Sequence, residues 1–123
     1  MGAPFVWYDV TATADEADTV REFYSTLLGW TIGPDTDPGP YNGWIMDGEQ
    51  PWASVIEATG PATSGRWIPY VQVDDLDVAV DKATSLGATV VAGKADGPAG
   101  TAVTIADPGG AVVALWTPFP DKT

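Results

Sequence analysis

The chain has 123 residues, of which 45% are apolar and 18% are charged, so it is long enough for one folded domain with its own core. It contains no cysteine and no histidine, which excludes disulfides, thiolate chemistry, imidazole acid–base catalysis and metal sites built on nitrogen or sulfur ligands. Its 17 acidic and 5 basic residues give a net charge of −12, which disfavours nucleic acid and anionic membranes as partners.

The start of the sequence carries neither the basic region nor the apolar region of a secretory signal, and no apolar run reaches membrane-spanning length. We therefore expect a cytoplasmic protein that forms one domain over residues 1–123 and has no membrane or nucleic-acid partner.

The first half of the chain predicts a strand, a helix and three further strands. Residues 5–10 are rich in aromatic and β-branched side chains, which favour a strand. Over residues 15–28 apolar side chains recur at three- and four-residue spacing, which predicts a helix that Gly29 ends. The remaining predicted elements are strands at 30–33, 44–47 and 52–58, a Pro/Gly loop at 34–40 and a turn at 48–51.

The second half repeats this order after a small, polar, turn-prone linker at residues 60–65. A helix is predicted over residues 76–86, with Val78, Val80 and Ala83 facing inward and Gly87 at its end. The predicted strands are residues 67–73, 89–92, 101–106 and 111–117.

The two halves also correspond in sequence. Leu27-Leu28-Gly29-Trp30 matches Ser85-Leu86-Gly87-Ala88, and Ile45-Met46-Asp47 matches Ile105-Ala106-Asp107. Both matches predict a duplicated supersecondary unit, with one copy at about residues 4–59 and the other at about 66–118.

Several short phrases in this order resemble the vicinal oxygen chelate superfamily, which contains glyoxalases, bleomycin-resistance proteins and extradiol dioxygenases. The phrases are Phe23-Tyr24, Leu28-Gly29-Trp30, Val73-Asp74-Asp75-Leu76-Asp77, Leu86-Gly87 and Asp107-Pro108-Gly109-Gly110. The resemblance covers about residues 5–118. It implies an α+β fold in which paired βαβββ modules form a half-open cupped sheet.

In metal-bearing members of that superfamily, one ligand on each of four strands holds the ion. Counting from the matched phrases places the first position on Asp9, with Trp7 as an alternative on the same face; counting from Asp15 gives Tyr8 on the opposite face. The other three positions fall on Ser54, Ile68 and Ala114. One carboxylate and one hydroxyl cannot supply three or four ligands, so we expect no metal and no other cofactor.

The same registers predict what lines the cup instead. The inward faces are predicted to carry Phe5, Trp7 and Asp9; Trp52, Ser54 and Ile56; Ile68, Tyr70 and Gln72; and Val112, Ala114 and Trp116. The predicted ligand-binding residues are therefore Trp7, Trp44, Trp52, Ser54, Tyr70, Gln72 and Trp116, with Trp44 at the rim. Tryptophan rings stack flat apolar ligands and hold cations, although each ring can equally pack a core or a dimer interface.

Asp9 is the candidate catalytic residue. A carboxylate desolvated beside Trp7 is expected to have a raised pKa suited to proton transfer. Alternatively, Asp9 anchors a cationic group of a ligand, or only bonds the backbone or Arg66. The cluster Asp74, Asp75 and Asp77 precedes a helix and predicts N-terminal capping rather than a metal site.

Three functions remain open at this point. The first is metal-independent binding of a small aromatic or hydrophobic molecule, including a cationic one, in a Trp-lined cup. The second is a metal-independent isomerase, cyclase or lyase that uses Asp9 as acid or base, and the third is an accessory module whose cup is closed by its own side chains. By resemblance we also expect a homodimer.

Overall fold

The computed structural model describes residues 5–33, 41–58, 60 and 63–120. The chain divides into two compact units. The N-terminal unit is Trp7–Ile68, and the C-terminal unit starts at Pro69 and includes residues 5 and 6. In the described part, no helix is both long and apolar enough to span a membrane.

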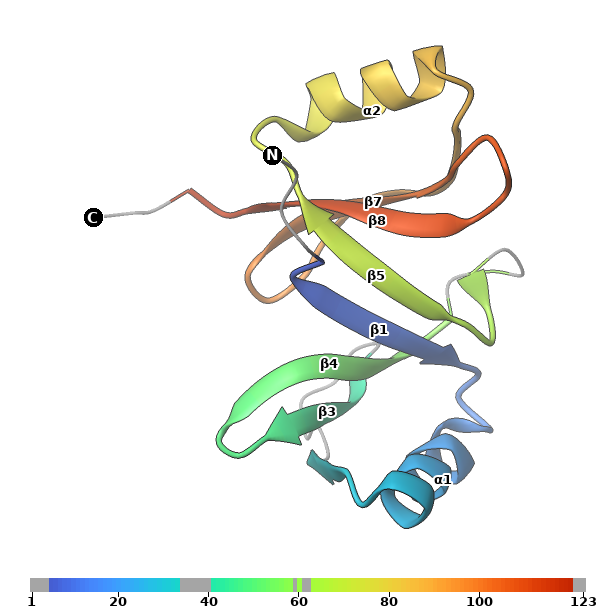
Figure 1. Cartoon of the computed structure of the whole chain (residues 1–123), viewed down its shortest axis with the longest axis vertical. Coiled ribbons are helices and arrows are strands. Elements are labelled where there is room, and N and C mark those ends of the chain that lie inside the picture. The colour runs from blue at the N-terminus through green and yellow to red at the C-terminus, as the bar shows by residue number, and fades with distance from the viewer. Residues whose placement is uncertain (1–4, 34–40, 59, 61–62, 121–123) are drawn as a thin grey trace. The chain divides into compact units, whose positions relative to one another are not determined.

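The N-terminal unit contains one helix beside one sheet (Figure 1). The sheet has the order β2-β3-β4-β1, in which β1 and β4 are parallel and the other neighbours are antiparallel. Its elements are β1 (Trp7–Ala12), α1 (Ala17–Leu28), β2 (Thr31–Gly33), β3 (Tyr41–Asp47) and β4 (Gln50–Glu57).

The C-terminal unit has the same construction (Figure 1). Its sheet has the order β5-β8-β7-β6, and again the first and last strands, β5 and β8, are parallel. Its elements are β5 (Trp67–Gln72), which starts in the last two residues of the N-terminal unit, α2 (Leu76–Ser85), β6 (Thr89–Asp96), β7 (Gly100–Ala106) and β8 (Val112–Pro118). The predicted α+β class with paired βαβββ modules is thus confirmed, and neither four-stranded arrangement closes on itself.

The C-terminus of α1 and the N-terminus of α2 lie where the sequence predicts, whereas α2 ends at Ser85, one residue before the predicted end. Gly29 adopts the left-handed conformation, with φ 71°, and donates its N–H to the carbonyl of Ser25 at 3.0 Å. Asp75 caps α2, because its Oδ1 accepts a hydrogen bond from the backbone N–H of Val78 at 3.1 Å. The acidic cluster before α2 therefore caps the helix, as predicted.

The next carboxylate of that cluster makes an ion pair on the surface. Asp77 Oδ1 accepts a hydrogen bond from Lys94 Nζ on β6 at 2.7 Å. This contact raises the pKa of Lys94 above its ordinary value of 10.5.

Each unit has its own core on the side of its helix. In the N-terminal unit the core consists of Val10, Ile45, Ala53 and Val55, with Val20 of α1 packed against it. In the C-terminal unit it consists of Leu76, Val103, Ile105 and Leu115, with Ala79, Val80 and Ala83 of α2 packed against it. Alternation therefore leaves Trp7, Asp9 and Ser54, and likewise Tyr70 and Ala114, on the sheet faces away from the helices.

Several boundaries and one side-chain direction differ from the sequence-based expectation, among them the starts of β3 at Tyr41 and of β4 at Gln50. The first strand begins at Trp7 rather than at Phe5, and both Phe5 and Val6 are exposed. The inward placement of Val78 is wrong, because residues two apart on a helix point in nearly opposite directions and Val80 faces the core; Val78 is 62% exposed. Strand β6 is also longer than predicted, since it continues to Asp96.

Two predicted connections fall at least partly outside the described residues. The loop at 34–40 lies outside them entirely, as do positions 61 and 62 of the predicted linker. In the rest of that linker, Thr63 N–H donates to the carbonyl of Gly60 at 3.1 Å.

Candidate functional site

The register of β1 and β4 places Asp9 directly beside Ser54. Ser54 is completely buried and Asp9 is 3% exposed. The Ser54 hydroxyl donates a short hydrogen bond to Asp9 Oδ1. A buried carboxylate requires such donors, because burial without them would destabilise its charged form.

Trp7 adds a second donor to this pair. It lies two residues before Asp9 on β1 and so shares its face. Its indole Nε1 lies 3.1 Å from Asp9 Oδ1 and 3.1 Å from Ser54 Oγ, so one N–H is shared between the two oxygens. The three side chains thereby connect β1 to β4.

Trp44 reaches the same place from β3. It is the register partner of Ser54, and its ring meets the Trp7 ring edge-on with centroids 6.1 Å apart. We call Trp7, Asp9, Ser54 and Trp44 the Asp9 cluster. The structure brings these four predicted site residues together, and two half-buried indoles beside a buried carboxylate can bind a flat or cationic group.

Trp52 does not join this cluster. A register shift in β3 and β4 pairs Ile45 with Ala53 but Met46 with Pro51, so Trp52 is the extra residue of a β-bulge. Its ring therefore leaves the face that strict alternation assigns to it. It contacts Tyr8 and Trp30 instead, at 6.0 and 5.0 Å between centroids.

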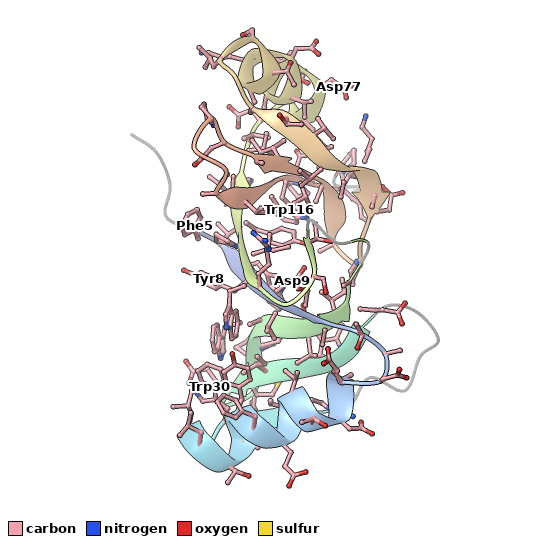
Figure 2. All side chains as sticks on the ribbon, turned by 90° about the vertical axis from the view of Figure 1, so that its right-hand side faces the viewer. Phe5, Tyr8, Asp9, Trp30, Asp77 and Trp116 are labelled. Atoms are coloured by element: carbon pink, nitrogen blue, oxygen red, sulfur yellow. The ribbon has the colours of Figure 1, made fainter. Side chains whose placement is uncertain are left out.

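These contacts belong to a second group, on the α1 side of the sheet, which we call the aromatic cluster: Tyr8, Tyr24, Trp30, Trp52 and Trp67. Figure 2 shows Tyr8 and Trp30 toward one side of the N-terminal unit, with Asp9 on the other side of β1. Trp52 and Trp67 stack with centroids 6.2 Å apart and an interplanar angle of 5°. Sequence reasoning missed this group, although alternation around the inward Ile68 would have placed Trp67 on the helix side.

The other predicted site residues belong to the C-terminal unit. Tyr70 pairs with Ala114 and Gln72 with Trp116 on the parallel strands β5 and β8. Gln72 is exposed, and Trp116, labelled in Figure 2, lies against Gly100 of β7. Tyr70, Gln72 and Trp116 thus gather within their own unit.

The pairing of strands corrects one of the inferred ligand positions. Asp9 lies opposite Ser54 in one unit, and Tyr70 lies opposite Ala114 in the other. The repeat therefore makes Tyr70, not Ile68, the counterpart of Asp9; counting from the start of α2 was wrong by two residues, which leaves the face unchanged.

The donor set does not fit the divalent metals of the superfamily. Asp9, Ser54, Tyr70 and Ala114 offer one carboxylate and two hydroxyls, and the carboxylate already accepts two hydrogen bonds. Among the described residues, no group of three or more His, Cys, Asp or Glu side chains is placed to hold a metal ion. Zinc, iron and nickel sites need three or four nitrogen, sulfur or carboxylate ligands.

Comparisons with known proteins agree with the fold. A family model described as the Glyoxalase-like domain matches residues 9–116. CFP32 of Mycobacterium bovis, which is named as a glyoxylase, is 34% identical to this chain over 118 residues. The matched region covers 89% of this chain and 44% of CFP32. This chain thus spans less than half the length of that relative and of its Mycobacterium tuberculosis counterpart.

Two solved structures show the same fold at low identity. A glyoxalase I variant from Zea mays is 18% identical with a TM-score of 0.59, over 98% of this chain and 44% of that one. Methylmalonyl-CoA epimerase from M. tuberculosis is 16% identical with a TM-score of 0.57, over 98% of this chain and 94% of that one. The chain therefore belongs to the glyoxalase-like family of the vicinal oxygen chelate superfamily.

Proposed function

We propose that this chain binds a small aromatic or hydrophobic molecule, including cationic ones, at the Asp9 cluster and without a metal. The observation that carries the proposal is the buried carboxylate of Asp9, held by the indole N–H of Trp7 and the hydroxyl of Ser54. Trp7 and Trp44 provide rings for stacking beside this negative charge, which is the combination that recognises an aromatic cation.

The charge of the chain and the names of its relatives support a small-molecule ligand. A net charge of −12 raises the local concentration of cations, which favours the approach of a cationic ligand. The curated relative carries a glyoxylase name, and one structural neighbour is an epimerase of a coenzyme A ester. Within the C-terminal unit taken by itself, Tyr70, Gln72 and Trp116 stay proposed binding residues. Trp52 stays a prediction, because its ring lies in the aromatic cluster.

The test uses 2-naphthylmethylammonium, a flat aromatic cation, titrated calorimetrically into the wild-type chain. We expect saturable binding that weakens about threefold in Trp7→Phe, since phenylalanine keeps a ring but attracts a cation more weakly than tryptophan does. Trp30→Phe, the same substitution in the aromatic cluster, is the matched control and should leave the affinity unchanged. Equal affinities in both variants, or no binding at millimolar probe, would contradict the proposal.

A metal-independent isomerase, cyclase or lyase is the second candidate. The observation that favours it is that hydrogen bonds from two side chains fix the Asp9 carboxylate in one orientation, as a general base requires. Methylmalonyl-CoA in D₂O is a suitable first probe, with exchange of its C–H proton followed by NMR. Asp9→Asn should then slow exchange by about a hundredfold. Exchange at the wild-type rate in Asp9→Asn would remove Asp9 as the acid or base.

The homodimer expected from the resemblance and the cytoplasmic location also stay proposals. Sedimentation equilibrium at micromolar concentration is the direct test of the first. A single species with the mass of one chain would overturn the dimer.

A further inference from the structure

A pocket of about 330 Å³ lies beside α1 in the N-terminal unit. Thr19, Val20, Phe23 and Tyr24 of α1 form one wall. The opposite wall comes from Val10 and Thr11 of β1 and from Gly65, Arg66 and Trp67. Its volume is within the range of small-molecule sites, and none of its lining residues belongs to the Asp9 cluster.

The aromatic part of the wall is held in a fixed geometry. Trp67 Nε1 donates a hydrogen bond of 2.9 Å to the Tyr24 hydroxyl, and the two rings meet edge-on at 5.5 Å between centroids. Phe23 lies edge-on to Tyr24 at 5.1 Å and is 55% exposed, so its ring is accessible to a ligand. Fixed rings of this kind can stack a planar apolar ligand without being ordered first.

The backbone of Arg66 is also fixed in place. The Thr11 hydroxyl accepts a hydrogen bond from Arg66 N–H at 3.0 Å, and Thr11 N–H donates to the Arg66 carbonyl at 3.0 Å. Gly65, with φ 66°, supplies the left-handed turn that precedes it. Arg66 therefore stays at the pocket, while its side chain extends into solvent.

The guanidinium of Arg66 is the charged group of this pocket. Within the part of the chain that the structure describes, it forms no ion pair, whereas Arg21 pairs with Asp18 and Lys94 with Asp77. The chain has 17 acidic and 5 basic residues, so its surface is mostly negative. At this pocket, by contrast, a positive charge lies beside three aromatic rings. The planar donors of Arg66 match a carboxylate or a sulfonate.

We infer that this pocket is a second binding site, which takes a planar aromatic molecule bearing one anionic group. The ring lies against Phe23, Tyr24 and Trp67, and the anion contacts Arg66. The site is independent of the proposed function, because it uses the helix side of the sheet and a ligand of opposite charge.

The probe is 2-naphthoate, which shares its ring with 2-naphthylmethylammonium and differs in the sign of its charge. We expect calorimetric titration at low salt to show saturable binding that weakens about fivefold in Arg66→Gln, as for one partly exposed charged contact. Thr19→Trp should abolish binding by filling the pocket from an exposed helix position. Lys94→Gln removes the same charge in the other unit and should leave binding unchanged.

The location of the site has its own readout in the wild-type chain. Amide NMR shifts on adding 2-naphthoate should concentrate at Val20, Gly65 and Trp67, and Trp7→Phe should not alter the affinity. Three results would each overturn the inference. They are amide shifts at Trp7 and Ser54 instead, an affinity for 2-naphthoate that is unchanged in Arg66→Gln and Thr19→Trp, and no binding of 2-naphthoate at millimolar concentration. If Trp7→Phe weakens the binding of 2-naphthylmethylammonium but not of 2-naphthoate, the two probes bind at different sites.

Discussion

The Trp7 indole has a structural role that its residue type alone does not indicate. Its N–H is shared between the carboxylate of Asp9 on its own strand and the hydroxyl of Ser54 on β4. The polar group of a tryptophan usually finds one partner when it is buried. Here it stabilises a buried negative charge and joins two strands through residues that are 47 positions apart in sequence.

A double-mutant cycle measures this coupling. Trp7→Phe keeps an aromatic ring but removes one donor to the buried carboxylate, and we expect it to lower the free energy of unfolding by about 1–3 kcal/mol. Ser54→Ala should have a similar effect, and the double variant should lose less than the sum of the two. Chemical denaturation followed by circular dichroism provides the measurement, and additive effects would show that the two donors act separately.

At the scale of elements, the sequence predicts helices better than strand faces. Gly29 and Asp75 mark helix ends by backbone chemistry that depends on neighbouring residues only, and both predictions are confirmed. Alternation in a regular strand likewise puts Trp7 and Asp9 on one face, whereas Asp9 and Ser54 were placed by the family resemblance and lie side by side through the register of β1 and β4.

The bulge at Trp52 shows why the rest of the site could not be predicted. A bulge depends on how two strands pair, so the sequence of β4 alone gives no sign of it. One inserted residue moves Trp52 from the face of Ser54 to the aromatic cluster. The pocket beside Arg66 was missed for a related reason, because it depends on the packing of α1 against residues distant in sequence.

Strand β7 contains a position where only glycine fits. A Cβ on Gly100 would lie 2.7 Å from Cε2 of Trp116 and closer still to the carbonyl oxygen of Thr117, which belongs to the paired strand β8. Because the backbone of β8 cannot move aside without breaking the ladder, we expect Gly100→Ala to cost about 3 kcal/mol or more. Gly93→Ala on β6 is the matched control, since a Cβ there meets nothing within 4 Å. Thermal unfolding of both variants checks the contrast, which equal melting temperatures would contradict.

At the scale of the whole molecule, a repeat of one supersecondary unit was predicted from short sequence matches, and the topology shows the same order of elements in both units. In each unit a strand, a helix and three strands follow in the same order, and the first strand is parallel to the last. The repeat is visible in sequence because helix-ending glycines and turn residues are retained in both halves. Side chains at equivalent positions, such as Asp9 and Tyr70, have diverged, and so the site does not repeat with the fold.

The charge of the molecule sets how its stability responds to salt. With a net charge of −12, repulsion between surface carboxylates opposes folding, and added salt screens it. We expect the melting temperature to rise by about 3–6 °C between 20 and 500 mM NaCl, which corresponds to roughly 1 kcal/mol.

A charge-reduced variant is the control for this effect. Glu22→Gln, Glu49→Gln and Asp81→Asn together neutralise three exposed carboxylates and should make the rise clearly smaller. A melting temperature that falls with salt in the wild-type chain would show that local ion pairs outweigh the overall repulsion.

The distribution of tryptophans makes the two halves of the molecule optically unequal. Of its 6 tryptophans, Trp116 belongs to the C-terminal unit, and the N-terminal unit holds Trp7, Trp30, Trp44, Trp52 and Trp67. Intrinsic fluorescence therefore follows the loosening of one half almost exclusively, whereas far-ultraviolet circular dichroism follows the backbone of both. The difference between the midpoints of the fluorescence and circular dichroism unfolding curves then measures how strongly the stability of one half depends on the other.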